Sequence, residues 1–301
     1  WEKSMKLNKK KILFLVLILG IAFVLTGCKV PTEIDPETGK SVVKLIKSTT
    51  TFKEVFENES WFNAILVWPL CQLINKFGPK YGIVLTITIV TILVNLITLP
   101  LTLKSTVQSQ QMQMIQPQMN KIQRKYEGKT DEASKMKQAQ EMQALYNKYN
   151  INPLGSLLMP LLQFPIIIAM YQAVQRSYEV RYGTFLGYSL GVTPLEGVKN
   201  GQYIYLVIFI FMAVCQFVSM MLPQWLAKRK AKIEALRHHR KPEDTTQPNQ
   251  GMMYSMMIPI LIISLMWPTA MSVYWAINSL INIVKTYVTQ VLFIDKKETT
   301  A

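Results

Sequence analysis

The sequence predicts an all-α membrane protein with five transmembrane helices, a cytoplasmic helical hairpin and an amphipathic helix in the outer interface. Half of the 301 residues are hydrophobic and 17% are charged, and the hydrophobic residues are gathered into long runs. Basic residues cluster between these runs, as they do in cytoplasmic loops. These observations disfavour a soluble domain, and the net charge of +15 favours an oriented membrane protein over a nucleic-acid-binding protein.

The first 27 residues have the pattern of an export signal. Lys9 to Lys11 precede an apolar segment from Ile12 to Leu25, and the small-residue sequence LTGC follows. A cysteine directly after small residues resembles the lipobox of bacterial lipoproteins, so we expect cleavage before Cys28 and a lipid on its sulfur. An uncleaved anchor is the alternative. The other cysteines, Cys71 and Cys215, stand alone in apolar surroundings and predict no disulfide framework.

Two further segments are expected on the outer side before the first span. Residues 28–60 form a polar extracytoplasmic segment. In residues 61–78, WFNAILVWPLCQLINKFG, apolar side chains recur at helical spacing together with Trp61 and Trp68. Tryptophan is favoured at the membrane interface, so this stretch predicts an amphipathic helix lying there, with Gly78 and Pro79 at its end.

Five apolar runs are interpreted as membrane spans, given that about 20 residues cross the hydrocarbon core. The predicted spans cover residues 83–103, 154–174, 203–222, 252–267 and 269–289. The last two come from one stretch, Met252 to Ile294, in which Lys285 is the only charged residue and which is about twice as long as one span needs. The sequence WPTA at 267–270 supplies the break between them.

The loops set the predicted orientation. Residues 104–150 and 223–251 are rich in Lys and Arg, which places both loops in the cytoplasm. The amino terminus and the loop 175–202 then lie outside, and the tail 290–301 lies in the cytoplasm.

The loop 104–150 carries two apolar stripes at spacings of three and four residues, which predict a helical hairpin. They consist of Met112, Ile115, Met119, Ile122 and Tyr126, and of Ala139, Met142, Tyr146 and Tyr149. Thr130 is the expected N-cap of the second helix, and a bend is expected near Pro117. A solvated spacer is the alternative.

Polar residues follow one face of two predicted spans. The first span presents Thr88, Thr91, Asn95, Thr98 and Thr102, and the fifth presents Ser272, Trp275, Ser279, Asn282, Thr286 and Thr289. The second span adds Gln163, and the third adds Gln216 and Ser219. Hydrogen bonds between helices, at about 1 kcal/mol or less each, explain any one of them. Whole polar faces also suit a hydrated cavity or groove.

The predicted spans contain no Asp, Glu or His, which disfavours proton relays, intramembrane proteolysis and metal sites. The sequence also has no phosphate-binding glycine loop, nucleophile elbow or zinc-binding helix. We therefore expect no covalent chemistry, which disfavours an enzyme.

Together, these elements resemble the YidC membrane protein insertases in their lipoprotein-type bacterial form. The resemblance rests on the lipobox, the five spans, the cytoplasmic hairpin and the sequences VNLITLPLT, PLLQFPIIIAMYQAV and WPTAMSVYWAINSLINIV. It implies a hydrophilic groove that receives hydrophilic parts of nascent membrane proteins, with Gln163 and Trp275 on groove-lining positions. It also implies the Sec translocase and the ribosome as partners, the lipid bilayer as surroundings, and neither a cofactor nor ATP hydrolysis.

The sequence departs from this family pattern at Asn95, a position that usually holds an arginine thought to attract acidic segments of the substrate. An amide donates and accepts hydrogen bonds but carries no charge, which puts this attraction in doubt. If the face of Asn95 is hydrated, an arginine introduced there should be tolerated.

Two other function classes remain open at this stage. One is a passive transporter or channel that uses the same polar cavity, and the other is a membrane-bound enzyme of lipid metabolism. The lack of intramembrane carboxylates and of a visible inverted repeat disfavours the first, and the lack of a catalytic constellation disfavours the second. A monomer is expected, because a hydrated groove needs no dimer axis.

Overall fold

The computed structural model describes residues 29–237, 239 and 250–295, and it is mainly helical, as the sequence predicts. The chain divides into two compact units. The first contains the chain up to Val90 together with Pro160–Gly191, and the second contains Thr91–Met159 together with the chain from Val192 onward. Cys28 and the signal segment lie outside the described residues.

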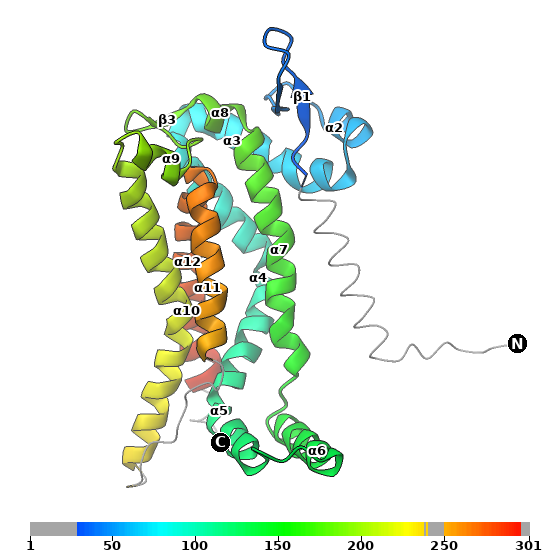
Figure 1. The fold of residues 1–301 in the computed structure, drawn as a ribbon, viewed down its shortest axis with the longest axis vertical. Helices are drawn as coiled ribbons and strands as arrows, with labels where there is room; N and C mark the ends of the chain where they lie inside the picture. The colour runs from blue at the N-terminus through cyan, green and yellow to red at the C-terminus, as the bar shows by residue number, and fades with distance from the viewer. Residues whose placement is uncertain (1–28, 238, 240–249, 296–301) are drawn as a thin grey trace, which may run out of the picture. The chain divides into compact units, whose positions relative to one another are not determined.

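The first unit holds the start of the described chain and most of α7. Its elements are β1 (Thr32–Ile34), β2 (Ser41–Val43), α2 (Phe52–Asn58), the π-helical turn η1 (Asn63–Val67), α3 (Trp68–Tyr81), the beginning of α4 (Ile83–Met114), α7 (Pro153–Arg176) from Pro160 onward, α8 (Tyr178–Tyr182), β3 (Thr184–Phe185) and β4 (Tyr188–Ser189) (Figure 1). Strands β1 and β2 pair antiparallel with Glu33 opposite Val42, and β3 pairs antiparallel with β4.

Helix α3 extends beyond the end that the sequence suggests. Pro79 lies inside the helix, which continues to Tyr81. Gly82 ends it by taking a left-handed φ of 78°, and its N–H donates to the carbonyl of Gly78 at 2.8 Å. Cys71 and Ile74 are fully buried whereas Trp61 is exposed, so the segment has one buried face and one open face.

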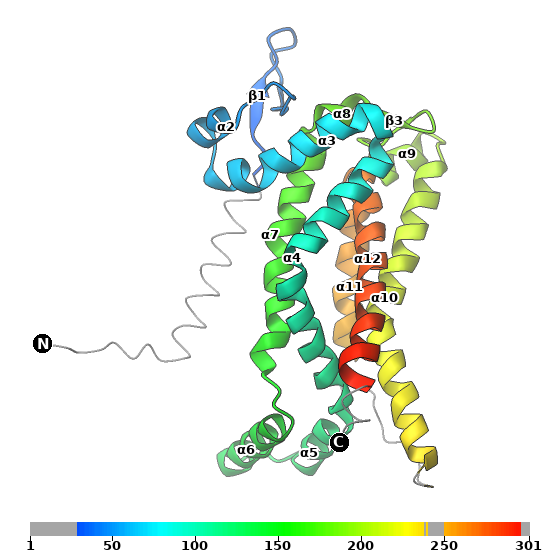
Figure 2. The same ribbon diagram turned by 180° about the vertical axis from the view of Figure 1, so that it is seen from behind.

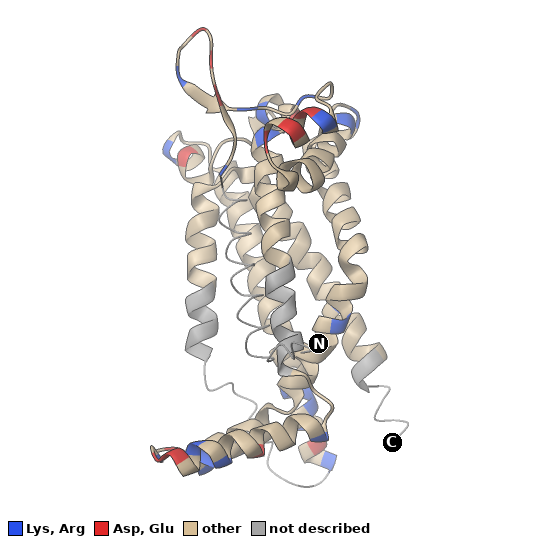
Figure 3. Ribbon diagram, turned by 90° about the vertical axis from the view of Figure 1, so that its right-hand side faces the viewer, with Lys and Arg blue, Asp and Glu red and all other residues tan. Residues whose placement is uncertain are grey.

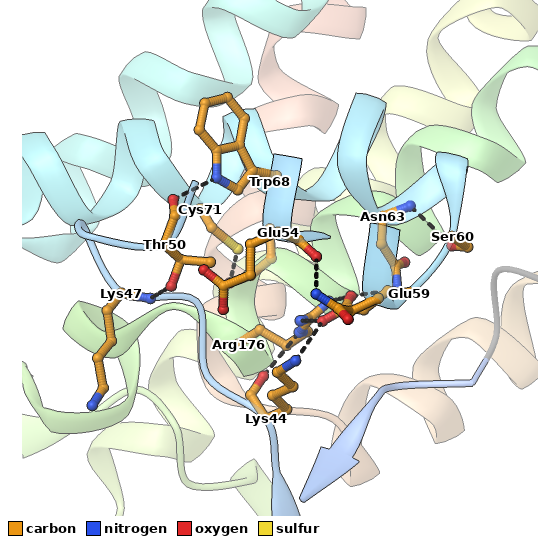
Figure 4. Close-up of polar contacts among 12 residues, drawn as sticks. Lys44, Lys47, Thr50, Glu54, Glu59, Ser60, Asn63, Trp68, Cys71 and Arg176 are labelled. Carbon is orange, nitrogen blue, oxygen red and sulfur yellow. Dashed lines mark hydrogen bonds and ion pairs between the residues drawn. The ribbon is translucent and has the colours of Figure 1, made fainter. Parts of the chain in front are cut away.

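A buried ion pair holds the segment before η1 against the end of α7 (Figure 4). The Arg176 guanidinium binds both carboxylate oxygens of Glu59, at 2.8 Å to Oε2 and 2.6 Å to Oε1. Its Nε donates to the carbonyl of Lys44 at 2.9 Å, and the Asn63 amide donates to Glu59 Oε2 at 2.9 Å. Both charges are thus hydrogen-bonded as well as paired, which burial of an ion pair requires.

The backbone between Lys44 and Thr50 is held by side chains of α3. Asn75 of α3 donates to the carbonyl of Ile46 at 2.6 Å and accepts from the hydroxyl of Ser177 at 2.7 Å. The Trp68 indole donates to the carbonyl of Thr50 at 2.8 Å (Figure 4). Residues far apart in sequence therefore form one hydrogen-bonded assembly.

The second unit is built mainly of long helices. Its elements are the rest of α4 from Thr91, α5 (Gln116–Lys125), α6 (Glu132–Lys148), the first residues of α7, α9 (Pro194–Lys199), α10 (Ile204–Arg237), α11 (Gln250–Met266), α12 (Thr269–Thr289) and the π-helical turn η2 (Gln290–Asp295) (Figure 2). Helix α10 packs along α12, and α11 contacts both. Between α11 and α12, the N–H and hydroxyl of Thr269 both donate to the carbonyl of Val192, at 2.9 and 2.7 Å.

Two helices run past the ends of the predicted spans. Helix α4 continues from the span ending at 103 to Met114, and α10 continues from 222 through Lys228 to Arg237. Lys, Arg and Gln are good helix formers, so the charges that end an apolar run do not end a helix. Among the described residues, α4 and α10 are the two helices that are long and apolar enough to cross a membrane.

Helices α5 and α6 pack through the apolar stripes of loop 104–150. Ile115, Met119, Leu145 and Ile151 form a buried cluster, with Met112, Ile122, Met142 and Tyr146 packed against it. Pro117 lies in the first turn of α5, directly after the end of α4. The N-cap of α6 is Asp131 rather than the expected Thr130, because the Asp131 carboxylate accepts from the N–H of Ser134 at 2.8 Å.

Charged side chains are unevenly distributed among the helices of this unit. Lys and Arg mark α5 and α6 together with acidic residues, while the long helices are almost free of charged side chains over most of their length (Figure 3). Lys125 of α5 forms an ion pair with Glu141 of α6, and the Tyr126 hydroxyl donates to the same carboxylate oxygen at 2.9 Å. Hydrogen bonding to Lys125 and then to Tyr126 lowers the pKa of the Glu141 carboxyl.

The buried ion pair predicts a large effect of its removal on stability. Glu59→Gln leaves the buried guanidinium of Arg176 without its counter-charge, so we expect a loss of about 3 kcal/mol in the free energy of unfolding. Thermal melting in detergent measures this loss. The exposed pair Lys53–Glu57 on α2 provides the matched control, because Glu57→Gln should cost about 0.5 kcal/mol or less. Equal effects of the two changes would contradict the role assigned to the ion pair.

Candidate functional site

Three of the threonines on the predicted polar face of α4 bind their own helix. The hydroxyls of Thr88, Thr98 and Thr102 donate to the carbonyls four residues earlier, at 2.8, 2.9 and 3.1 Å. Thr91 is fully buried. Such hydroxyls are already satisfied within the helix and need no water or neighbouring helix. Thr88 belongs to the first unit, and the other threonines belong to the second.

Asn95 makes side-chain contacts with a second helix. Its Nδ2 donates to the carbonyl of Thr91 at 2.9 Å and to Oδ1 of Asn278 on α12 at 3.1 Å. Its Oδ1 accepts from the ammonium of Lys285, also on α12, at 2.8 Å. We call Asn95, Asn278 and Lys285 the Asn95 network. It joins two helices separated by more than a hundred residues in sequence.

Lys285 brings a positive charge into this network. Its side chain is buried, with 8% of the residue exposed. Within the part of the chain that the structure describes, no carboxylate forms an ion pair with the ammonium, and the Asn95 amide is its hydrogen-bond partner. A neutral amide oxygen orients the ammonium without cancelling its charge.

A cavity of about 320 Å³ adjoins the network between α4 and α12. Its lining consists of Ile92, Asn95, Leu96, Leu99, Leu280, Ile281, Val284 and Lys285. Leu96 and Val284 are 58% and 60% exposed, so the apolar walls reach the outer surface of the helix pair. The surface that faces the cavity is almost entirely apolar, although Asn95 and Lys285 belong to its lining.

The other residues predicted for the site are spread over the helices. The Ser279 hydroxyl donates to Gln216 Oε1 of α10 at 2.6 Å, and the Gln110 amide of α4 donates to the carbonyl of Thr286 at 2.8 Å. The Trp275 ring stacks on that of Trp267, with centroids 5.4 Å apart. These contacts hold α12 to its neighbours, as the interhelical reading of the polar face expects.

Three predicted residues take no part in these interhelical contacts. Ser272 is buried, and its hydroxyl has no hydrogen-bond partner among the described residues. Asn282 is half-buried. Gln163, on α7, belongs to the first unit and is half-buried.

Sequence reasoning missed Asn278 and Lys285 as site residues. A signal for both was present, because they stand seven residues apart and so share one face of α12, and because Lys285 is the only charge between Met252 and Ile294. The predicted stripe followed Ser279 and Asn282 instead, at neighbouring positions of the same helix.

The described residues offer little to covalent or metal chemistry. They hold no group of three or more His, Cys, Asp or Glu side chains able to bind a metal ion. Cys71 and Cys215 are buried and free. Burial raises the pKa of the Cys71 thiol to about 12, so this thiol stays protonated and unreactive at neutral pH.

Comparison with known proteins gives consistent matches. The family model described as 60Kd inner membrane protein matches residues 73–297. Membrane protein insertase YidC 2 of Bacillus anthracis is 31% identical over 285 residues, which cover 93% of this chain and 93% of that protein. Membrane protein insertase MisCA of Bacillus subtilis (strain 168) is 30% identical, with 93% of this chain and 92% of that protein covered.

The Asn95–Lys285 contact changes the expectation for an arginine at position 95. Asn95→Arg places a second cation beside Lys285, and two unit charges about 4 Å apart repel by about 4 kcal/mol at an effective dielectric constant of about 20. We expect a clear loss of melting temperature in detergent, and recovery of most of it in the double variant with Lys285→Gln.

Leu93→Arg is the matched control, because Leu93 is exposed on α4 and takes no part in the network. Lys285→Gln should not relieve its effect. Lys285→Gln could restore the melting temperature of both arginine variants equally, or of neither. Either result would show that the proximity of the two cations does not determine stability at this site.

Proposed function

Because the chain belongs to the family of YidC membrane protein insertases, we propose that it receives hydrophilic parts of nascent membrane proteins in a polar intramembrane groove and releases their helices into the bilayer. The family consists of insertases, not enzymes, and it is described as one of inner membrane proteins. The observation that carries the proposal is the Asn95 network, which keeps two amides and an ammonium on facing helices beside an open apolar cavity.

The physical role of such a groove is to lower the cost of dehydration. A peptide or polar side chain without a hydrogen-bond partner in hydrocarbon costs several kcal/mol. Polar groups along the path replace part of the lost water, so a short hydrophilic segment enters without an input of chemical energy. The proposed lining consists of Thr88, Thr91, Asn95, Thr98, Gln163, Gln216, Ser272, Trp275, Ser279 and Asn282, now joined by Asn278 and Lys285.

The proposed arrangement in the membrane uses α4, α7, α10, α11 and α12 as the five spans. Helix α3 lies in the outer interface, α5 and α6 form the cytoplasmic hairpin, and a lipid on Cys28 anchors the amino terminus outside. The basic residues of α5, α6 and the end of α10 support this orientation. They also suit contact with the ribosome, and the Sec translocase is a further partner of the proposed monomer.

The orientation predicts which single cysteines a membrane-impermeant maleimide reaches in intact cells. Lys199→Cys should be labelled, whereas Lys129→Cys and Arg237→Cys should be labelled only after permeabilisation. The native Cys71 gives little background, since its thiol is buried and protonated. Labelling at position 129 or 237 in intact cells would overturn the orientation.

Depletion of the protein tests the function itself. We expect small single-span membrane proteins to accumulate uninserted, and to be inserted again when the chain is reconstituted alone in vesicles. Solute flux through the same vesicles is measured in parallel. Normal insertion after depletion, together with a protein-dependent solute flux, would favour a channel over an insertase.

A further inference from the structure

We propose that a cavity between α3 and the turn at residues 47–50 is a binding site for one anionic phospholipid of the outer leaflet. The lipid phosphate lies at the ammonium of Lys76, and the glycerol and the first acyl carbons cover Trp68 and Leu73. This inference goes beyond the proposed insertase function. It depends only on the proposed position of α3 in the outer interface.

The cavity lies within the first unit and has a volume of about 440 Å³. Its lining consists of Ser48, Trp68, Pro69, Gln72, Leu73 and Lys76. Sites for small molecules measure about 300 to 1,000 Å³, so this volume is sufficient for a ligand but too small for a whole phospholipid. It suits the part of the lipid between the phosphate and the start of the acyl chains.

Hydrogen bonds hold the turn beside α3 and form the cavity. The Gln72 amide donates to the carbonyls of Lys47 and Thr50, both at 2.9 Å, and the Trp68 indole donates to the same Thr50 carbonyl at 2.8 Å (Figure 4). These bonds use both amide hydrogens of Gln72 and the N–H of Trp68. The two side chains therefore keep no donor for a ligand, and most of the surface that faces the cavity is apolar.

Lys76 supplies a positive charge at the edge of this apolar surface. It is exposed, and within the part of the chain that the structure describes no carboxylate pairs with it. Lys44 and Lys53 of the same unit, in contrast, pair with Glu59 and Glu57. The lining contains no acidic residue among those described. An apolar cavity beside one unpaired cation suits an amphiphile with an anionic head, whereas a free phosphate ion would leave the apolar surface uncovered.

The surface next to the cavity is aromatic and exposed. Phe52 of α2 packs edge-on against Trp68, with ring centroids 5.6 Å apart, and stacks on Phe56 at 5.9 Å. Phe52 and Phe56 are 43% and 51% exposed. Rings of this kind are enriched where proteins meet the boundary between lipid and water. We therefore expect the cavity to lie at the level of the lipid headgroups.

The charge of the headgroup distinguishes one phospholipid from another. In phosphatidylglycerol the phosphate carries the only charge, and the headgroup hydroxyls can bond to the hydroxyl of Ser48. In phosphatidylcholine a quaternary ammonium follows the phosphate. It would approach Lys76 and also Lys80, which stands one turn further along the same face of α3. Repulsion between these cations favours the anionic lipid.

The experiment cross-links lipid to the full chain in vesicles of phosphatidylcholine and phosphatidylglycerol. A trace of one probe, phosphatidylglycerol or phosphatidylcholine with a diazirine close to the glycerol, is activated by light, and mass spectrometry identifies the labelled residues. Lys76→Gln removes the charge, and Ser48→Trp fills the cavity from the turn. Lys40→Gln is the matched control, because Lys40 is an exposed lysine of the same unit outside the cavity.

We expect the phosphatidylglycerol probe to label Trp68 and Leu73 about threefold more than the phosphatidylcholine probe, as one exposed charge pair allows. Lys76→Gln should abolish this preference and leave labelling by the phosphatidylcholine probe unchanged. Ser48→Trp should lower labelling by both probes, and Lys40→Gln should behave like wild type. Melting temperatures confirm that each variant is folded.

Three results would overturn the inference. Lys76→Gln and Lys40→Gln would alter the preference equally or not at all, labelling would spread evenly over α2 and α3 and resist Ser48→Trp, or soluble glycerol phosphate would displace the probe. The second result identifies general contact with the bilayer, and the third identifies a site for the phosphate alone.

Insertion of a single-span client is measured in the same vesicles, so that the two proposals fail separately. Lys76→Gln should leave insertion unchanged. A wild type that binds the lipid but inserts no client contradicts the proposed function alone. A wild type that inserts the client but is not labelled at Trp68 and Leu73 contradicts the lipid site alone.

Discussion

A polar group on a helix packed in apolar surroundings must find its hydrogen-bond partner within the protein, and the packing of the second unit depends on this constraint. Gln110 reaches the carbonyl of Thr286, Ser279 reaches Gln216, and Asn95 reaches Asn278 and Lys285. Each of these bonds joins α12 to α4 or α10. Helix α12 therefore takes part in each of these hydrogen bonds between helices.

The first unit meets the same constraint with charges of both signs. Arg176 and Glu59 compensate each other, and the Asn63 amide and the Lys44 carbonyl complete their hydrogen bonding. This arrangement is closed, because the charge of each group is matched inside the unit. The Asn95 network is open by comparison, since its charge is matched by no described carboxylate. The contrast separates a buried ion pair from a buried cation that is held by a neutral amide.

The sequence predicts the helical class of the fold, because long apolar runs and helical spacing are direct consequences of burial. The ends of the helices were harder to predict. Charges suggested that the first span ends near 103 and the third near 222, but helix-forming side chains carry α4 to Met114 and α10 to Arg237. At α3, Gly82 rather than Pro79 ends the helix, because the stop is set by a left-handed backbone conformation that sequence spacing does not reveal.

The candidate site was predictable only in part. The periodic polar face drew attention to Asn95, but the partners of Asn95 depend on how α12 is rotated against α4, and a single sequence does not contain that rotation. Threonines and asparagines also count equally in a polar stripe. The structure separates them, since Thr98 bonds to its own helix while Asn95 crosses to the next.

The hydrogen bonds of the Asn95 network all point the same way. An ammonium only donates, so Lys285 turns the oxygen of Asn95 toward itself, and the amide hydrogens of Asn95 then face the oxygen of Asn278. The network is thus a polarised chain of hydrogen bonds, in which the ammonium of Lys285 sets the direction of the Asn95 amide dipole and, through it, of the bond to Asn278.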